Sequence, residues 1–295
     1  MRLSTLSMNL KSFNIIYSTS SRYDNLITQM VSGNKIQKGS EDPVLAQKSI
    51  YLTNLKTENE QYLKNANDAK SLLDYTESIL SQGSDILTRV KELAIQASSN
   101  TIQNESREAI VKELDQIILE MTNLGNQQYN GKYIFAGTNT TTKPFDLDGE
   151  PANNIKYNGN NGKILYNISN GFPMASNIPG DNVFLETIQD LITVRNDIQS
   201  GDIQNITNIG FDLIENGIDR LINSRTELGA KSNITETAIS RITAMDLELE
   251  SSYTSLMGVN IAEKQIEATS LEVSYQASLS VVSKLHSMSI LNYIN

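Results

Sequence analysis

The last quarter of the chain, residues 231–295, carries apolar residues at alternating steps of four and three. This spacing predicts a long helix with one narrow apolar stripe, of the kind that forms coiled coils. The stripe comprises Ala238, Ile242, Met245, Leu249, Leu256 and Val259, and a weaker stripe follows at Leu271, Tyr275, Val282 and Leu285. Such a helix cannot bury its stripe alone, so it requires a partner in this chain or in another.

The first 31 residues offer that partner, because they carry a heptad pattern of their own. Its apolar positions are Leu6, Phe13, Ile16, Tyr23, Ile27 and Met30. Both ends of the chain are also rich in Ser, Thr and Asn, which disfavour helix interiors. We therefore expect the two ends to pair as helices and to be largely unfolded in the isolated monomer. Simple disorder of the free ends is the alternative.

Two further helices are predicted inside these ends. Residues 33–39 are typical of a loop, and Ser40-Glu41-Asp42-Pro43 is typical of a helix start, because a polar cap precedes a proline in the first turn. This helix should run to about Ser98, and a second helix should follow a turn at 100–104 and extend to Leu124. Helices joined by a short turn pack antiparallel.

Residues 126–182 differ in composition and predict a small β region. Turn dipeptides such as Asn-Gly and Pro-Gly bound short β-prone runs at 133–135 and 163–166. Residues 158–162 should form a hairpin tip, with a mobile Asn-rich loop as the alternative. A helix should resume near Asn182 or Val183 and stop at Ser200-Gly201. Asp202 should cap the next helix, and a kink is expected at Gly210 or Gly217.

Together these elements predict a mainly α fold, a helical bundle and coiled coil from paired N- and C-terminal helices with a small inserted β domain. The expected N-terminal coiled-coil segment is 1–40, and it should pair with the C-terminal segment 255–295. The helical core should have two parts, 41–137 and 182–254, and the β domain between them should cover 138–181.

Composition excludes several classes of function. The formal net charge of −10 disfavours a nucleic-acid backbone or an anionic membrane as a partner. The absence of Cys and the presence of a single His remove thiol chemistry, disulfides and most metal sites. No apolar run approaches the length of a membrane span, and no signal peptide is evident. We therefore expect neither nucleic-acid binding nor membrane insertion.

The side chains predict neither catalysis nor a cofactor. His286 stands in the last predicted helical turns among serines, which is typical of a surface histidine. Residues 146–150 look only faintly like a calcium loop, because they lack the later ligands. Glu248 and Glu250 project to different faces of a helix, so they cannot act as an acid/base pair.

Motifs along nearly the whole chain are similar to those of one family. They are Gly33-Asn34-Lys35-Ile36 with Glu41-Asp42-Pro43, Asn65-Ala66-Asn67-Asp68-Ala69, Leu93-Ala94-Ile95-Gln96-Ala97, Arg225-Thr226-Glu227-Leu228-Gly229-Ala230 and Tyr275-Gln276-Ala277-Ser278-Leu279. In combination they resemble the bacterial flagellin family. The run 130–138 followed by Pro144-Phe145, and the run 182–192, resemble its hook-associated protein 3 branch. Asn260 departs from the family pattern, in which many relatives carry Asp.

The resemblance implies a structural component of the bacterial flagellum at the hook–filament junction. There the chain would link hook-associated protein 1 to flagellin and form a ring with copies of itself. It would leave the cytoplasm through the flagellar type III system and become extracellular. Before export, a chaperone would bind the C-terminal helices within 231–295, with candidate contacts at Leu271, Tyr275, Leu279, Val282 and Leu285.

The resemblance also implies a patch that an innate immune receptor reads in flagellins. Arg89, Leu93 and Glu113 match it, and the alternative is ordinary surface packing between subunits. Two alternatives to the junction role also stay open. One is a short filament flagellin. The other is a type III needle-tip or translocator protein, which would need a long apolar segment that the sequence lacks.

Overall fold

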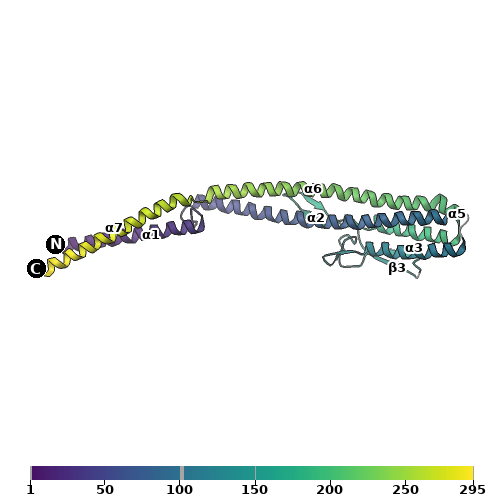
Figure 1. The fold of residues 1–295 in the computed structure, drawn as a ribbon, viewed down its shortest axis with the longest axis horizontal. Helices are drawn as coiled ribbons and strands as arrows, with labels where there is room; N and C mark the ends of the chain where they lie inside the picture. Colours follow the sequence, from purple (N-terminus) through teal and green to yellow (C-terminus); the bar gives the residue numbers. More distant parts are fainter. Residues whose placement is uncertain (1, 100–102, 150, 295) are drawn as a thin grey trace. The chain divides into compact units, whose positions relative to one another are not determined.

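Long helices account for most of the protein. The computed structural model describes residues 2–99, 103–149 and 151–294. Its long helices are α1 (Arg2–Ser32), α2 (Pro43–Ala97), α3 (Asn104–Gly125), α4 (Glu186–Ser200), α6 (Phe211–Met257) and α7 (Ile261–Ile294), and the single turn α5 (Ile203–Asn205) precedes α6 (Figure 1). The predicted mainly α fold with paired terminal helices and a small β insertion is confirmed.

The chain divides into two compact units. Residues 1–58 and 245–295 form the first, here called the terminal unit. Residues 59–244 form the second, the central unit. Both α2 and α6 contribute residues to each unit.

In the terminal unit, α1 lies antiparallel against α7 (Figure 1). Buried or partly buried positions of α1 recur at steps of four and three, at Ser12, Ile16, Thr19, Tyr23, Leu26 and Met30. Those of α7 have the same spacing, at Lys264, Ala268, Leu271, Tyr275, Ser278 and Val282. Two facing stripes with this spacing make a coiled-coil seam.

The seam predicted in residues 1–31 is partly wrong. The predicted positions that face α7 are Ile16, Tyr23 and Met30. Phe13 and Ile27, however, are 56% and 36% exposed, and Leu26 takes the buried position at 6%. The reason is that α1 carries two adjacent apolar stripes, and the predicted pattern combined members of both. The side chain of Leu6 lies outside the described residues.

The stripe predicted from Ala238 to Val259 does not belong to one continuous helix. α6 ends at Met257, and Val259 lies in the break before α7. The break forms because the Val259 amide donates to the Gly33 carbonyl at 3.0 Å instead of continuing the helix. Residues 1–31 pair with α7, which lies within the segment 255–295 expected to be their partner, whereas most of the predicted stripe lies on α6.

The members of that stripe divide between the two units. Ala238 and Ile242 pack on the core of the central unit, where the Asn59 side chain donates to the Ile242 carbonyl at 3.0 Å. In the terminal unit Leu249 is buried and Leu256 is half-buried. Met245 is 48% exposed, so its predicted place in the seam is wrong.

In the central unit, α2 and α6 run antiparallel, and α3 and α4 pack against each other (Figure 1). Ion pairs join α2 to α6 at Glu77–Arg225 (2.7 Å) and Lys91–Glu215 (2.9 Å). The predicted helices from Pro43 to about Ser98 and up to Leu124 are confirmed. Residues 100–102 of the predicted turn lie outside the described residues.

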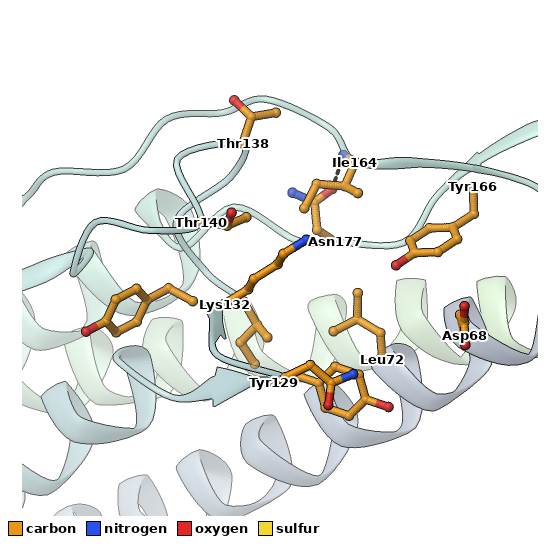
Figure 2. Close-up of a pocket in the computed structure, with 12 residues that line it drawn as sticks. Asp68, Leu72, Tyr129, Lys132, Thr138, Thr140, Ile164, Tyr166 and Asn177 are labelled. Atoms are coloured by element: carbon orange, nitrogen blue, oxygen red, sulfur yellow. Dashed lines mark hydrogen bonds between the residues drawn. The ribbon is translucent and has the colours of Figure 1, made fainter. Parts of the chain in front are cut away.

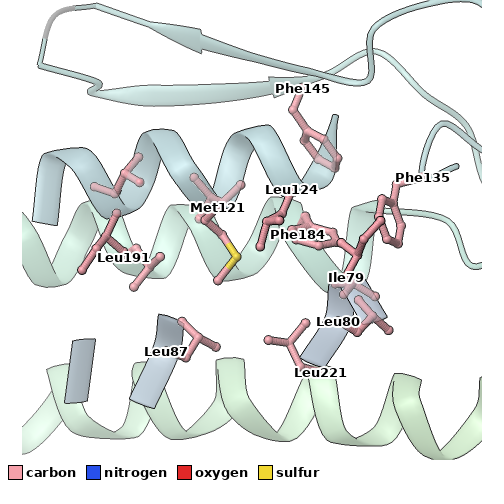
Figure 3. Packing of buried hydrophobic residues seen from close by; sticks show 14 of the residues in the cluster. Ile79, Leu80, Leu87, Met121, Leu124, Phe135, Phe145, Phe184, Leu191 and Leu221 are labelled. Carbon is pink, nitrogen blue, oxygen red and sulfur yellow. The ribbon is translucent and has the colours of Figure 1, made fainter. Parts of the chain in front are cut away.

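An aromatic cluster joins the β region to the helices (Figure 3). Phe135 packs edge-on against Phe184 at 4.6 Å between ring centroids, and Phe145 lies 6.0 Å from Phe184. Gly125 and Gly180 allow this approach, because a Cβ on either glycine would lie 2.7 Å from the Phe145 ring. The glycines therefore fix how closely the insertion sits on α3 and α4.

In the described part of the β region, the strands form three two-stranded antiparallel hairpins. They pair β1 (Gln128–Tyr129) with β2 (Lys132–Tyr133), β3 (Phe145–Asp148) with β4 (Asn154–Tyr157), and β5 (Leu165–Asn167) with β6 (Pro173–Ala175). The predicted hairpin tip at 158–162 is wrong, because this segment joins two different hairpins. Its conformation is held by the Asn160 side chain, which accepts from the amides of Thr138 and Gly162 at 2.9 Å each.

The return to helix follows the prediction closely. A π-helical turn at Asp181–Leu185 leads into α4, which ends at Gly201 with φ 74°. Asp202 caps the next turn by accepting from the Asn205 amide at 3.0 Å. A second π-helical turn, Ile206–Gly210, lies at one of the two predicted kink positions, whereas α6 passes through Gly217 without interruption.

Candidate assembly surfaces

Few apolar side chains of the terminal unit are buried. Among its described side chains, the buried hydrophobic residues are Leu26, Leu249, Met257 and Ala268. It exposes many more, at Leu10, Phe13, Ile15, Tyr17, Ile27, Val31, Val44, Ile50, Tyr51, Met245, Leu247, Ile261, Ile266, Val273, Leu279 and Val281. Large exposed apolar surfaces of this kind mark sites of protein interaction. The surface of the terminal unit is therefore a candidate site of contact with other chains.

One part of this surface is an ordered stripe on α1. Leu10, Phe13, Tyr17, Ile27 and Val31 fall on heptad positions beside the face that meets α7, with Ser20 and Asp24 in the remaining slots. Tyr17 and Val31 are 79% and 84% exposed. Such a stripe presents knobs to a further helix. We call it the outer stripe.

The predicted chaperone contacts on α7 differ in exposure. Leu271, Tyr275 and Val282 are half-buried against α1. Leu279 is 44% exposed. The side chain of Leu285 lies outside the described residues. Three of the five residues thus become fully accessible only when α7 separates from α1.

A hydrogen-bonded joint closes the terminal unit where α1 and α6 both end. The Lys35 ammonium donates to the carbonyls of Ser255 at 3.2 Å and Leu256 at 2.9 Å, and the Lys35 amide donates to the Met257 carbonyl at 2.7 Å. The Gln29 side chain in turn donates to the Lys35 carbonyl at 2.9 Å. The carbonyls of a last helical turn lack helical partners, so Lys35 supplies them. Sequence reasoning missed this role of Lys35.

The three residues matched to the receptor patch do not share one surface. The Arg89 guanidinium on α2 donates to Glu113 on α3 at 2.9 Å, and it also pairs with Glu92 at 3.0 Å. Leu93 is only 1% exposed and belongs to the core between the helices. The expectation that Leu93 is a surface residue is therefore wrong, whereas Arg89 and Glu113 remain accessible.

Two arginines fix α4 inside the central unit. Arg195 is 1% exposed, donates to the Ala152 carbonyl, and places its Nε 3.3 Å from a carboxylate oxygen of Asp115. Arg220 of α6 binds Asp190 of α4. Burial raises the pKa of Asp190, and its bond to Arg220 opposes that rise. These bonds tie α3, α4, α6 and the β region into one unit.

Neither a membrane span nor a metal cluster is evident in the part of the chain that the structure describes. None of its described helices has the length and apolar character that a bilayer crossing requires. No three described His, Asp or Glu side chains gather as metal ligands. The side chain of His286 lies outside the described residues.

The sequence matches the two helical regions that define one family. Residues 3–140 match the bacterial flagellin N-terminal helical region, and residues 211–294 match the bacterial flagellin C-terminal helical region. The chain belongs to the bacterial flagellin family. The two matches cover α1 to the β1–β2 hairpin and α6 to α7, and the remaining β region and α4 lie between them.

Two kinds of relative within the flagellin family are similar to this chain. Flagellar hook-associated protein 3 of Salmonella typhimurium is 30% identical over 147 residues, which is 50% of this chain and 46% of that protein. The matched part thus spans about half the length of that curated relative. The flagellin of Bacillus subtilis is 25% identical over 300 aligned positions, covering 96% of each chain.

A solved structure has the same arrangement of elements. The crystal structure of FlgL from Bacillus cereus superposes with a TM-score of 0.60 and 26% identity, covering 69% of this chain and 99% of that one. The flagellin-like helical fold is therefore shared with a solved member of the family.

Proposed function

We propose that this chain is a structural subunit of the flagellar hook–filament junction, where it adapts hook-associated protein 1 to the first flagellins. In this proposal helical surfaces perform the whole function, and no catalysis is involved. The chain is exported through the flagellar type III system and acts outside the cell. Its similarity to hook-associated protein 3 and to FlgL supports the junction role.

The observation that carries the proposal is the apolar surface of the terminal unit. The outer stripe of α1 and the exposed positions of α7 remain uncovered after the two helices pair. Copies of the same chain arranged in a ring would cover them, and hook-associated protein 1 and flagellin would cover those at either end. Burial in the assembly then provides the stability that the terminal unit lacks alone.

The proposed domains separate the parts that contact other subunits from the helical core and the β insertion. Residues 1–40 and 255–295 form the segment that pairs and enters subunit contacts. Residues 41–137 and 182–254 form the helical core, and 138–181 form an outward β insertion. We assign the Arg89–Glu113 pair to packing between neighbouring subunits, since buried Leu93 removes the apolar part of a receptor patch.

A strain that lacks this chain tests the junction role. Hooks should still form, but filaments should not attach, and flagellin monomers should accumulate in the culture medium. Re-expression of the full chain should restore attached filaments. Attached filaments of normal length in the deletion strain would contradict the proposal.

A short filament flagellin is the second candidate, because the flagellin of Bacillus subtilis matches along nearly the whole chain. The two roles differ in copy number. A junction protein stops at a ring, whereas a flagellin continues to polymerise. Quantitative immunoblotting of sheared flagella should give a constant amount of this chain per flagellum. An amount that grows with filament length would favour the flagellin role.

We further propose that a flagellar export chaperone binds α7 before assembly. The half-buried stripe of Leu271, Tyr275 and Val282 is free only when α1 has not yet paired with it. A chaperone groove can cover such a stripe during export. Deleting residues 271–295 should abolish capture by the chaperone in a pull-down, whereas deleting the insertion 138–181 should not. Full affinity after the first deletion would refute this proposal.

A further inference from the structure

A cavity of about 480 Å³ lies in the central unit between α2 and the β region (Figure 2). Its lining includes Asp68 and Leu72 from α2, Tyr129 and Lys132 from the β1–β2 hairpin, and Tyr166 from β5. Its volume is within the range of roughly 300–1,000 Å³ that is usual for small-molecule sites. None of the assembly surfaces described above uses it.

The β1–β2 hairpin places two of these side chains together. Asn130 and Gly131 form its two-residue turn, with φ values of 51° and 75°, as this tight turn requires. Tyr129 and Lys132 are directly opposite in the register, so their side chains lie on one face of the hairpin. Figure 2 shows Lys132 extending toward Asn177 and the Tyr166 hydroxyl directed toward Leu72.

The walls of the cavity are held rigidly. Asn177 accepts from the Ile164 amide at 2.8 Å and donates to the Gly162 carbonyl at 2.9 Å. The Tyr129 ring packs against the Tyr75 ring at 5.4 Å between centroids. These contacts hold Asn177 and Tyr129 in place in the lining of the cavity.

Four polar groups around the cavity have no partner within the described part of the chain. They are the Asp68 carboxylate and the Lys132 ammonium, on exposed residues, and the hydroxyls of Tyr129 and Tyr166, on half-buried residues. No hydrogen bond or ion pair from 2–99, 103–149 or 151–294 reaches them, so all four are free to meet a ligand from solvent. Burial raises the pKa of Tyr166, and the charge of Asp68 adds to the rise. A tyrosine with its ordinary pKa of about 10 is already protonated at neutral pH, so the Tyr166 hydroxyl can donate.

The chemistry of these groups restricts what could bind. Lys132 only donates, Asp68 only accepts, and tyrosine hydroxyls do both. One positive and one negative charge favour a ligand without net charge. The ligand must therefore carry closely spaced groups that donate and accept, around a compact body that can lie beside Leu72 and the tyrosine rings. Hydroxyl groups on a sugar ring meet all of these requirements.

We propose that this cavity binds a neutral saccharide unit, with Asp68 and Lys132 on its hydroxyls and Tyr129 and Tyr166 beside its C–H surface. A peptide main chain also alternates donors and acceptors, so it is the alternative occupant that a capped peptide probe distinguishes. The saccharide site is independent of the proposed junction role, because it lies outside the terminal unit.

Saturation-transfer NMR on the full chain tests the site directly. The probes are N-acetylglucosamine, methyl α-mannopyranoside and the capped peptide acetyl-Ala-Ser-Gly-amide, each at millimolar concentration. At least one saccharide should receive saturation. Asp68→Ala and Tyr166→Ala should each raise the Kd of that saccharide about tenfold. The first removes a hydrogen bond to a sugar hydroxyl, and the second removes the ring that lies beside the C–H surface.

Matched variants separate binding from folding. Tyr17→Ala removes an exposed tyrosine of the terminal unit and should leave the Kd unchanged. Tyr166→Phe keeps the ring and should weaken binding less than Tyr166→Ala. Three results would each overturn the proposal. The first is that neither saccharide receives saturation, and the second is that only the peptide does. The third is that the Asp68 and Tyr166 variants transfer as much saturation to the saccharide as the original chain.

Discussion

The Lys35 ammonium lies 2.9 Å from the carbonyl oxygen of Leu256, although 221 residues separate the two in the sequence. A lysine at this place both bonds the last free carbonyls of α6 and offsets the negative end of the helix dipole. The contact also brings together the ends of α1 and α6 inside the terminal unit. The joint is thus the point from which the α1–α7 pair begins.

Lys35→Met should loosen this joint. We expect amide hydrogen exchange at Gly258 and Val259 to become several-fold faster, because an exposed charged hydrogen bond is worth about 1 kcal/mol locally. Exchange in the central unit should not change. Lys38→Met, in the same loop, is the matched control, and equal acceleration in both variants would show that Lys35 has no special role.

Gly125→Ala and Gly229→Ala should have opposite effects on the central unit. A Cβ at Gly125 would lie 2.7 Å from the Phe145 ring, so we expect a loss of about 1–3 kcal/mol in the free energy of unfolding. A Cβ at Gly229 meets nothing within 4 Å, and alanine there should add about 0.5–1 kcal/mol. Urea denaturation measures both. Equal effects of the two substitutions would contradict the close packing of Phe145.

Arg195→Met should destabilise the central unit by about 2–4 kcal/mol, because it leaves the Ala152 carbonyl without its donor and Asp115 without its cation. Because Asp115 is partly exposed, we expect the loss in the free energy of unfolding to lie toward the lower end of this range. Arg241→Met, at an exposed position of α6, should change stability by less than about 0.5 kcal/mol. Similar midpoints of unfolding for the two variants would refute the role of Arg195.

Alkaline pH should weaken the central unit through Tyr157. Its hydroxyl donates to the Phe135 carbonyl at 2.8 Å, and burial raises its pKa above the ordinary value of 10.0. The folded state therefore holds this proton more tightly than the unfolded state. Tyr157 therefore contributes fully to the free energy of unfolding at pH values below its ordinary pKa of 10.0. This contribution is lost as the pH rises through the raised pKa of the folded state.

Tyr157→Phe isolates this contribution. At pH 8 the variant should be about 1 kcal/mol less stable, because one hydrogen bond is missing. Above pH 10 its stability should fall less steeply than that of the original chain. Tyr51→Phe, at an exposed position, should reproduce the original profile. Parallel pH profiles for the chain and the Tyr157 variant would be evidence against this assignment.

The sequence predicted where helices begin and end better than it predicted which of their residues pack against other elements. The start of α2 at Pro43 and the cap at Asp202 follow from local chemistry, so both were predictable. The register of α1 was not, because Leu26 and Ile27 are adjacent and either could complete a heptad. Only the position of α7 decides which one is buried.

The break at Gly258 and the burial of Leu93 were missed for a related reason. The sequence has no proline near residue 258, and the helix stops because Gly33 and Lys35 bond its end from a distant segment. Leu93 belongs to the core of the central unit, and the pattern of a single helix does not reveal this burial. The cavity beside Tyr166 likewise requires three segments to come together.

Immunogold labelling of intact flagella, with an antibody against the insertion 138–181, tests the central claim most directly. The insertion is a suitable target because it lies outside the terminal unit that we propose is buried on assembly. The junction role predicts gold confined to the boundary between hook and filament. Gold distributed along the filament would contradict it and would assign the chain to the filament itself.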